Sequence, residues 1–339
     1  MPRISVLIPC FNHGAWIDEA VESVLAQTLQ DFEIIIVDDG STDDATRDKL
    51  AAYERPATRV LRTGNRGLPA ARNTAAAHAT GEFLCALDAD DRLAPTWFAK
   101  AVAVLDADPG IAFVSHWLET FGDEHWTWRP EHCDLPAMLA RNTVNGAALV
   151  RRTAFDAVGG YKEEMRQGCE DWDFWLRLIE RGFRGTIIPE VLFYYRRSSE
   201  SMSRMMLDET SYRAPLAALI SRHETGYRAH AIDILVAKEM ESLSLLDEID
   251  GLERDHVAET LPALARAREE LMALDRAVAQ ASEIVNQRQQ QERLAVEQER
   301  LSAEVNALRR EVADLRRSGS WRITAPLRWV VGVIRREPR

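Results

Sequence analysis

The sequence is poor in cysteine and contains no long apolar run. Its four cysteines (Cys10, Cys85, Cys133 and Cys169) are widely scattered and form no C-x-x-C pair. This spacing argues against a structural zinc site or a disulfide framework, so we expect buried thiols in a reducing cytosol. No stretch of about 18 apolar residues is present, and the start, MPRISVLIPCFN, lacks the apolar core and cleavage site of a signal peptide. These absences predict a cytoplasmic protein without a segment that spans a bilayer.

The sequence also has no excess of basic residues. The 339 residues carry 42 Lys and Arg against 54 Asp and Glu, which gives a formal net charge of -12. Phosphate backbones select basic surfaces, so this balance argues against nucleic acid as the main partner. Hydrophobic residues make up 46% and charged residues 28%, as in globular proteins. The length predicts a catalytic domain with appendages rather than one compact domain.

Short β-rich runs alternate with helical patterns over the first half of the chain. The strands predicted from these runs cover residues 4–9, 32–37, 59–61 and 82–87. The predicted helices cover residues 15–29, 45–53 and 69–79, and a further helix begins near Pro95. This alternation predicts an α/β fold with a doubly wound, mostly parallel sheet. Ligands bind at the carboxyl ends of the strands in such sheets, so polar motifs there are candidates for function.

The chain changes character from about residue 208, where strand signals disappear, and residues 284–317 carry a heptad repeat. Leucine recurs at the d positions, and valine occupies the last two a positions (Leu294, Leu301, Leu308, Leu315; Val305, Val312). This combination favours a parallel two-stranded coiled coil. The same register places Glu304 opposite Arg309, and Glu311 opposite Arg316, across the seam. We therefore expect a homodimer; the alternative is a single, solvated, charge-rich helix.

The C-terminal tail reverses the acidity of the chain. It holds five arginines against one acid, together with two tryptophans (Arg322, Arg328, Arg335, Arg336, Arg339; Glu337; Trp321, Trp329). Such a segment suits the headgroup region of an anionic membrane, which would give peripheral contact at its inner face. A disordered or partner-docking tail explains the composition equally well. The expected parts of the chain are a catalytic domain (1–205), a helical extension (206–283), a coiled coil (284–317) and a basic amphipathic tail (318–339).

Acidic motifs stand where two of the predicted strands end. The motif DDG (38–40) follows the strand at 32–37, and DADD (88–91) follows the strand at 82–87. A carboxylate in the first motif can accept a hydrogen bond from a pyrimidine or a ribose, although Asp-Gly is often only a turn. Carboxylates clustered in the second repel one another unless a cation neutralises them, and oxygen ligands suit Mg²⁺ or Mn²⁺ on a diphosphate. The alternative is an acidic loop that caps the following helix.

A third acidic pair, Glu170-Asp171, precedes the helical pattern WDFWLR. Acidic residues in the first turn of a helix often only satisfy its free N–H groups. The pair becomes a candidate for catalysis if it faces the same cleft as the other two motifs.

Six motifs follow one another between residue 4 and about residue 203. They are SVLIPCFN (5–12), VDDGSTD (37–43), NRGLPAARN (65–73), LDADD (87–91), VGGY (158–161) and EDW (170–172). In this order they closely resemble the family 2 glycosyltransferases. The resemblance implies a GT-A fold with a doubly wound mixed sheet, and an inverting, metal-dependent transfer of a sugar from a nucleoside diphosphate to a hydroxyl.

The resemblance also implies roles on the donor side. Pro9 and Asn12 would line the nucleoside pocket, and Asp39 would read the pyrimidine base. Arg72 would lie near the nucleotide, where its charge helps to hold Asp39 and the cleft carboxylates. Arg196 is the candidate phosphate contact, since an arginine fork matches phosphate oxygens. Uracil and thymine present the same edge to Asp39, so UDP and dTDP donors both remain open.

At the reaction centre, the resemblance assigns Asp88 to the ribose or donor sugar and Asp90 to a Mn²⁺ or Mg²⁺ ion. Asp171 would be the general base that takes the proton from the acceptor hydroxyl, with Glu170 supporting it. These roles agree with the chemistry, because inversion needs one base at the hydroxyl and a positive clamp on the leaving diphosphate.

The acceptor side is less well defined. His116, Trp117, Trp126 and Trp128 lie between the metal motif and the base. Their rings either stack on a sugar or belong to the core, which is the commoner fate of tryptophan. The basic tail beside a coiled coil favours a glycan or lipid-linked acceptor in surface polysaccharide synthesis.

Two other functions compete with the transferase. A sugar nucleotidyltransferase would share the sheet and the metal site but needs a Gly-rich, basic loop after the first strand, where this chain has PCFNHG (9–14). A coiled-coil scaffold with an inactive transferase domain is the second rival, against which the intact carboxylates argue.

Overall fold

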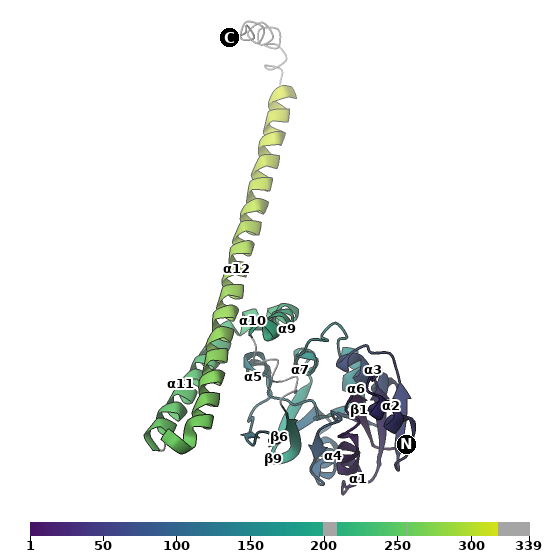
Figure 1. The fold of residues 1–339 in the computed structure, drawn as a ribbon. Helices are drawn as coiled ribbons and strands as arrows, with labels where there is room; N and C mark the ends of the chain where they lie inside the picture. The colour runs from purple at the N-terminus through teal and green to yellow at the C-terminus, as the bar shows by residue number, and fades with distance from the viewer. Residues whose placement is uncertain (199–208, 256, 318–339) are drawn as a thin grey trace. The chain divides into compact units, whose positions relative to one another are not determined.

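The computed structural model describes residues 1–198, 209–255 and 257–317. The chain divides into two compact units, Met1–Leu274 and Asp275–Arg339, and each is described by itself. The first unit contains a sheet with its covering helices (Figure 1). The basic tail predicted at 318–339 lies outside the described residues, so its membrane role stays a prediction.

Parallel strands form the first half of the sheet. They are β1 (Ile4–Cys10), β2 (Phe32–Asp38), β3 (Thr58–Arg62) and β4 (Phe83–Ala86), in the order β3-β2-β1-β4. Every residue of β1 is buried. Burial on both faces explains why this strand is a continuous apolar run in the sequence. The order brings the loops after β1, β2 and β4 to one edge of the sheet, and the predicted strands in this half are confirmed.

Beyond β4 the sheet becomes mixed. The remaining strands are β8 (Leu149–Arg151), β6 (Ile111–Gly122), β9 (Arg184–Arg197), β5 (Arg92–Leu93) and β7 (Thr127–Trp128). β8 runs antiparallel to β4 and β6, β9 runs parallel to β6, and β5 runs antiparallel to β9. The expected parallel pairing therefore holds for the half that carries the first two acidic motifs, and the whole sheet is mixed.

Helices cover both faces of the sheet. They are α1 (Ile17–Leu25), α2 (Asp44–Ala51), α3 (Leu68–His78), α4 (Trp97–Ala107), α5 (Leu135–Ala140), α6 (Arg152–Val158) and α7 (Glu170–Glu180). On one face, Val6 of β1 shares a core cluster with Val21 of α1 and Trp97 of α4. α3 contacts β1 and β2. The buried alanines of α3 lie outside that cluster, so α3 packs against the opposite face of the sheet.

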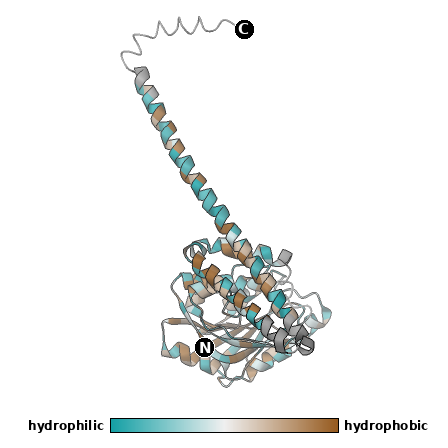
Figure 2. Cartoon of the chain, turned by 90° about the vertical axis from the view of Figure 1, so that its left-hand side faces the viewer, coloured by the Kyte–Doolittle hydropathy of each residue, from teal (hydrophilic) through white to brown (hydrophobic). Residues whose placement is uncertain are grey.

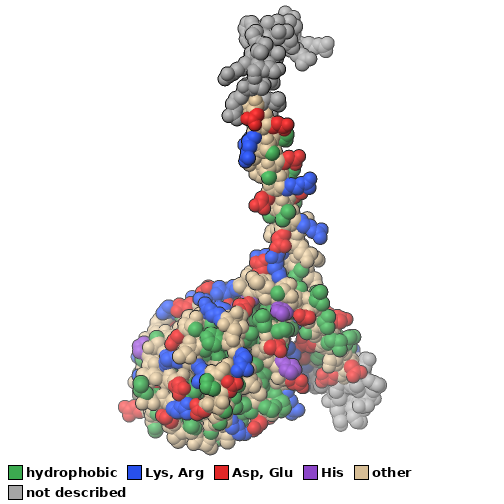
Figure 3. Space-filling model, turned by 180° about the vertical axis from the view of Figure 1, so that it is seen from behind, with side chains coloured by type: hydrophobic (Ala, Val, Ile, Leu, Met, Phe, Trp, Pro, Cys, Tyr) green, Lys and Arg blue, Asp and Glu red, His purple; other side chains and the backbone are tan. Residues whose placement is uncertain are grey.

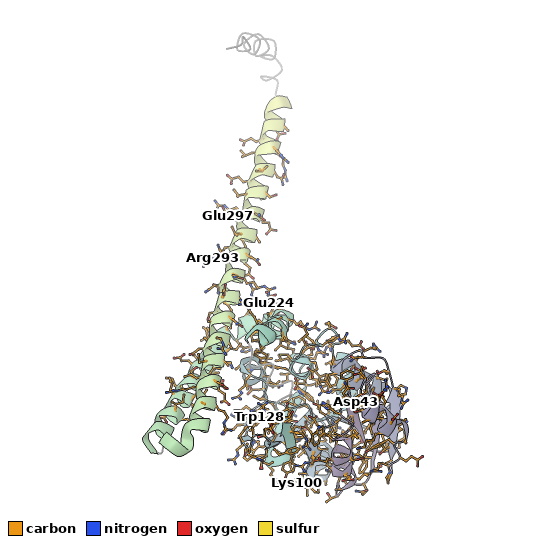
Figure 4. The ribbon with its side chains drawn as sticks, viewed as in Figure 1. Asp43, Lys100, Trp128, Glu224, Arg293 and Glu297 are labelled. Atoms are coloured by element: carbon orange, nitrogen blue, oxygen red, sulfur yellow. The ribbon has the colours of Figure 1, made fainter. Side chains whose placement is uncertain are left out.

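Two local features follow directly from the sequence. Asp43 caps α2, because its carboxylate accepts hydrogen bonds from the amides of Ala45 (3.3 Å) and Thr46 (2.9 Å); Figure 4 labels Asp43. The four cysteines are buried, unpaired thiols, as expected from their spacing.

Further helices follow the sheet. They are α9 (Glu209–Arg222), α10 (Glu224–Ala229), α11 (Ala231–Asp255) and α12 (Val257–Arg317). α11 packs against α5, where Arg141 Nη1 pairs with Glu241 Oε1 at 2.7 Å. The region predicted as a helical extension therefore contacts the sheet domain directly.

In the second unit, the described residues 275–317 belong to α12. Apolar residues recur among polar ones along this helix (Figure 2), and its surface carries charges of both signs (Figure 3). Arg293 and Glu297 are labelled on it in Figure 4. Among the helices of the described residues, none is long and apolar enough to cross a membrane.

Candidate active site

Asn12 ties together the loops after β1 and β2. Its side-chain oxygen accepts hydrogen bonds from the amides of Thr42 (2.8 Å) and Asp43 (3.0 Å), and its own amide donates to Ser41 Oγ (3.0 Å). Asn12 has a positive φ of 59°, which asparagine tolerates better than most residues. Pro9 is buried near the end of β1, beyond the residues that pair with β4. The two residues predicted for the nucleoside pocket thus stand at the carboxyl end of β1.

Asp39 holds the loop that follows β3. Its carboxylate accepts hydrogen bonds from Thr63 Oγ1 (3.0 Å), from the Gly67 amide (2.7 Å) and from the Arg66 amide, which both oxygens share (3.0 and 3.2 Å). The residue is buried. A carboxylate offers roughly four acceptor positions, so a base N–H could join only by displacing one of these bonds. The predicted contact between Asp39 and a pyrimidine stays a prediction.

One guanidinium joins the second and third acidic motifs. Arg72, on α3, donates from Nη2 to Asp88 Oδ1 (2.8 Å) and from Nη1 to Glu170 Oε1 (2.7 Å). Asp88 follows β4 and Glu170 begins α7, so two motifs far apart in the sequence meet at one edge of the sheet. This contact brings the pair Glu170-Asp171 to the second of the other two acidic motifs, so the pair stays a candidate for catalysis.

The expectation that Arg72 also holds Asp39 needs correction. In the part of the chain that the structure describes, the hydrogen bonds of Arg72 go to Asp88 and Glu170, while Asp39 is held by the loop after β3. The reason is the position of Arg72 in the second turn of α3, which aims it at the strand end of β4 rather than at β2.

The guanidinium of Arg72 packs on the ring of Tyr161. The guanidinium carbon lies 5.3 Å from the centre of the Tyr161 ring, and Arg72 is only 3% exposed. The neighbouring Asn73 donates to the Tyr161 carbonyl (2.8 Å) and accepts from the Tyr161 amide (2.9 Å). A side chain at Gly160, which has a φ of 64°, would meet Asn73 Oδ1 at 2.6 Å. These contacts explain why the motifs at 65–73 and 158–161 occur together.

Asp171 lies beside Glu170 in the first turn of α7. Its Oδ2 accepts a hydrogen bond from Asn142 Nδ2 (3.1 Å), and its Oδ1 accepts one from the Trp172 amide (2.7 Å). Burial raises the pKa of Asp171, opposed by the charge of Arg72. Burial also raises the pKa of Glu170 to about 7. A carboxylate with a raised pKa is better suited to accept a proton near neutral pH.

Arg196, at the end of β9, supports the acidic loop after β4. Its Nε donates to the Asp90 carbonyl (2.9 Å), its amide donates to Asp91 Oδ1 (2.8 Å), and Nη2 pairs with Glu19 Oε2 (2.6 Å). The guanidinium carbon also lies 4.1 Å from the centre of a Trp16 ring. Arg196 is thus placed beside the predicted metal ligand, and its contact with phosphate stays a prediction.

The acidic loop concentrates negative charge. Burial and the neighbouring Asp88 raise the pKa of Asp90. Burial, followed by the charge of Asp90, raises the pKa of Asp91, which is 1% exposed. His13 Nδ1 lies 3.7 Å from Asp90 Oδ1. Neither His13 nor Asn142 was among the residues predicted from the sequence; the position of His13 one residue after Asn12 was the only available signal.

The aromatic residues proposed for the acceptor side divide between core and surface. His116 is fully buried, with its ring centre 4.2 Å from that of Trp97, and burial lowers its pKa to about 4. It belongs to the core. Trp117 donates its indole N–H to a backbone carbonyl, and Trp128 packs against the core cluster from β7. Trp126 is 39% exposed, which leaves it available to stack on a sugar.

Comparison with known proteins decides the family. The sequence model of glycosyl transferase family 2 matches residues 5–167. The putative glycosyltransferase EpsE of Bacillus subtilis is 30% identical over 212 residues, which cover 60% of this chain and 76% of EpsE. The chain belongs to glycosyl transferase family 2. An uncharacterized glycosyltransferase of Haemophilus influenzae is also 30% identical to this transferase over 211 residues, covering 58% of it and 71% of the relative.

A solved structure supports the fold of the transferase. The crystal structure of S. aureus TarS 1-349 in complex with UDP-GlcNAc matches it with a TM-score of 0.52 at 20% sequence identity. The match covers 83% of this transferase and 91% of the TarS chain. The predicted GT-A architecture, a mixed α/β sheet followed by a helical region, is confirmed.

Proposed function

We propose that this family 2 glycosyltransferase moves a sugar, with inversion, from UDP or dTDP to a hydroxyl of a glycan or lipid-linked acceptor in surface polysaccharide synthesis. The contact that carries the proposal is the bridge from Arg72 to Asp88 and Glu170 (2.8 and 2.7 Å). It brings the carboxylates assigned to the donor and those assigned to the acceptor to one edge of the sheet, as a displacement between two bound substrates requires.

In this proposal Asp171 is the general base. It takes the proton from the acceptor hydroxyl while that oxygen forms a bond to the anomeric carbon, and the bond from that carbon to the diphosphate oxygen breaks on the opposite face. Asn142 and the Trp172 amide orient the Asp171 carboxylate. Glu170 supports the base by keeping Arg72 in place, because that guanidinium bonds Glu170 Oε1.

We also propose that Asp90 binds Mn²⁺ or Mg²⁺ together with the diphosphate. Burial and the repulsion from Asp88 raise the pKa of Asp90, and this unfavourable charge is the observation that fits a cation here. Among the described residues, no group of three or more His, Cys, Asp or Glu side chains is arranged to hold a metal ion. Oxygens of the diphosphate would therefore have to complete the coordination, and the ion would stabilise the charge that develops on the leaving group.

On the donor side, Pro9 and Asn12 are assigned to the nucleoside pocket, Asp39 to the base and Arg196 to the diphosphate. UDP is the first nucleotide to test, because TarS, whose fold this chain shares, was solved with UDP-GlcNAc. dTDP offers the same pyrimidine edge and is the second.

The test is a thermal-shift series with UDP, dTDP and GDP, each with and without Mn²⁺, on the wild type, Asp90→Ala and Asp156→Ala. Asp156 is an exposed carboxylate on α6 and serves as the matched control. A nucleotide at 100 times its dissociation constant adds about 2.7 kcal/mol of stability. We expect a Mn²⁺-dependent shift with UDP or dTDP that is lost in Asp90→Ala and kept in Asp156→Ala.

Transfer itself is then measured as acceptor-dependent release of the nucleoside diphosphate from UDP- and dTDP-sugars. A shift for one nucleotide, followed by release of that diphosphate, supports the proposal. No shift with any nucleotide would overturn it and favour the alternative, a coiled-coil scaffold with an inactive transferase domain.

We further propose that the chain forms a parallel homodimer through residues 284–317. In the described helix the heptad residues are open to solvent, with Leu294 58%, Leu301 50%, Val305 46% and Leu308 54% exposed. An apolar stripe of this kind on a solvated helix is costly unless a second helix covers it. The partner we infer is a second copy, because Glu304 faces Arg309 across a parallel, in-register pair.

This pairing is tested by sedimentation of the full chain, its Leu301→Asp variant and its Val296→Asp variant. Val296 is 67% exposed but occupies an outer position of the heptad, so it controls for the added charge. Leu301→Asp should give a monomer and Val296→Asp a dimer. A monomeric wild type, or a Leu301→Asp dimer, contradicts the proposal.

Finally, we propose that the enzyme works at the cytoplasmic face of the membrane, where lipid-linked acceptors are made, with the arginine-rich tail as its peripheral contact. Flotation with anionic liposomes is compared between the full chain and a version that ends at Arg317. Equal flotation of the two would exclude the tail from membrane binding.

A further inference from the structure

The side of α7 opposite Asp171 carries a cluster of charged side chains around the buried Asp173. Asp173 is 0% exposed. It accepts hydrogen bonds from Arg177 Nε on α7 (2.7 Å), from Arg222 Nε at the end of α9 (2.7 Å) and from His223 Nε2 (3.3 Å). Arg177 continues to the carbonyls of Val158 (2.8 Å) and Gly160 (2.7 Å). The cluster therefore joins α7 to α9 on one side and to the end of α6 on the other.

His223 bonds both ends of α7. Its Nε2 lies 3.3 Å from Asp173 Oδ1 in the first turn, and its Nδ1 lies 2.8 Å from Glu180 Oε2 in the last. The two carboxylates are seven residues apart, about two turns of an α-helix, and so lie on one face. Both ring nitrogens face carboxylate oxygens, so the doubly protonated imidazolium can donate a hydrogen bond to each of them. His223 is 2% exposed.

Arg222 adds a second link beside it. Besides Asp173, it bonds Glu164 Oε1 through Nη1 (2.9 Å), in the loop before α7. Arg222 and His223 thus contact the start of α7, its end and the chain that leads into it. Both residues lie outside the segment 5–167 that matches the family model, so this support comes from the helical region that follows the sheet.

The geometry of a helix relates this cluster to the position of Asp171. Successive residues of an α-helix are about 100° apart around its axis, so Asp171 and Asp173 point about 160° apart. Asp171 meets Asn142 on the front, and Asp173 meets Arg222 and His223 on the back. Rotation of α7 about its axis would break the bonds at Asp173 and Glu180, and the same rotation would move the carboxylate of Asp171.

We propose that Arg222 and His223 are positioning residues, which hold α7 at the rotation that places the Asp171 carboxylate beside Asn142. The inference rests on the proposed role of Asp171 as the base. It assigns to the helices after the sheet a part in the transfer reaction, carried out through α7 and without contact with either substrate.

The test uses the full chain with Arg222→Gln, Arg222→Lys and His223→Gln. Arg213→Gln is the matched control, because Arg213 is exposed on the same helix, α9. Each protein is assayed well below its own melting temperature, so that loss of folded protein does not enter the rate. A misplaced catalytic group can cost about a hundredfold. We expect kcat to fall about tenfold to a hundredfold in Arg222→Gln and His223→Gln, with the donor KM within about twofold of wild type.

Arg222→Lys keeps the charge and should recover part of kcat, while Arg213→Gln should match the wild type. A second measurement needs no turnover: amide hydrogen exchange of peptides covering residues 168–176 should be faster in Arg222→Gln and unchanged in Arg213→Gln.

Normal kcat in both Gln variants of an active enzyme overturns the proposal, and so does unchanged exchange at 168–176. If the wild type transfers no sugar while exchange responds as expected, the proposed function fails and the mechanical link between α9 and α7 stands. The two failures are therefore distinguishable.

Discussion

Two charged clusters adjoin α7, and their carboxylates are in opposite electrostatic situations. In the cluster around Arg72, called the cleft face below, three carboxylates share one arginine (Asp88, Glu170 and Asp171). In the cluster around Asp173, called the back face below, three carboxylates share three cations (Asp173, Glu180 and Glu164; Arg177, Arg222 and His223). Burial raises the pKa values of Glu170 and Asp171. Burial acts in the same direction on Asp173, but the hydrogen bond from His223 and the charge of Arg177 outweigh it and hold the pKa of Asp173 below its ordinary range.

This difference distinguishes carboxylates that can react from carboxylates that hold the structure in place. A carboxylate that is poorly compensated can take up a proton or a cation, and such groups gather at functional sites. A carboxylate that is fully bonded cannot react without loss of those bonds, and it serves to fix the structure. The same helix therefore presents a reactive face and an anchoring face, and substitutions on the two should have different consequences.

The largest effect is expected at the cleft face. In Asp171→Asn the amide cannot accept the proton of the acceptor hydroxyl, so kcat should fall about 10²- to 10⁴-fold. Stability should not fall, because the change removes one of several like charges around Arg72. Initial rates of nucleoside diphosphate release and thermal melts measure the two quantities. Retained activity would remove Asp171 from the role of base.

On the back face, Asp173→Asn should act mainly on stability. The substitution leaves Arg177 and His223, which are largely buried, and the more exposed Arg222 without their shared anion, and breaking a buried pair costs about 3–5 kcal/mol. Denaturant unfolding at pH 7 measures the loss, with Asp171→Asn as the matched Asp-to-Asn control. A free energy of unfolding equal to that of wild type would contradict the contrast between the two faces.

The pH dependence of stability offers a sharper test of the cleft face. The pKa of Glu170 is raised from 4.5 to about 7 in the folded protein. The stability that Glu170 adds over Glu170→Gln is therefore fully present below pH 4.5 and is lost as the pH rises through 7. The free energy of unfolding should fall by about 3 kcal/mol at most. Unfolding of both proteins from pH 4 to 8 measures the difference. If the difference in stability between the two proteins does not change with pH, the charge of Arg72 fully offsets the effect of burial on the pKa of Glu170.

Much of the cleft face could be predicted from the sequence. The acidic motifs follow strands whose apolar runs are visible locally, and parallel strands bring their carboxyl ends to one edge. That rule placed Asp88 and Asp90 correctly at this edge. It could not show that Arg72 bonds Asp88 and Glu170 rather than Asp39, because the direction of a side chain depends on packing against Tyr161.

The back face could not be predicted, for a physical reason. Asp173 is separated from Arg222 and His223 by about fifty residues of strand and helix, and such a contact leaves no periodicity in either segment. Local pattern likewise gave His116 two possible fates, and only the packing on Trp97 places it in the core. Motifs reveal the reactive groups, whereas the groups that hold them become visible only in three dimensions.

The smallest effect on stability should come from His223→Gln. This effect should change with pH over a different range from that of Glu170→Gln. Burial lowers the pKa of His223, but the carboxylates of Asp173 and Glu180 outweigh this and raise it above 6.5. The stability that His223 adds over His223→Gln is therefore fully present below pH 6.5 and is lost as the pH rises through the raised value in the folded protein. Hydrogen bonds to charged groups suggest about 1.5 kcal/mol for the difference at pH 6. His125→Gln, at an exposed histidine between β6 and β7, is the control for the substitution itself. If the advantage of wild type over His223→Gln grew as the pH rose, the histidine would be neutral in the folded protein, and the anchoring face would depend on its arginines alone.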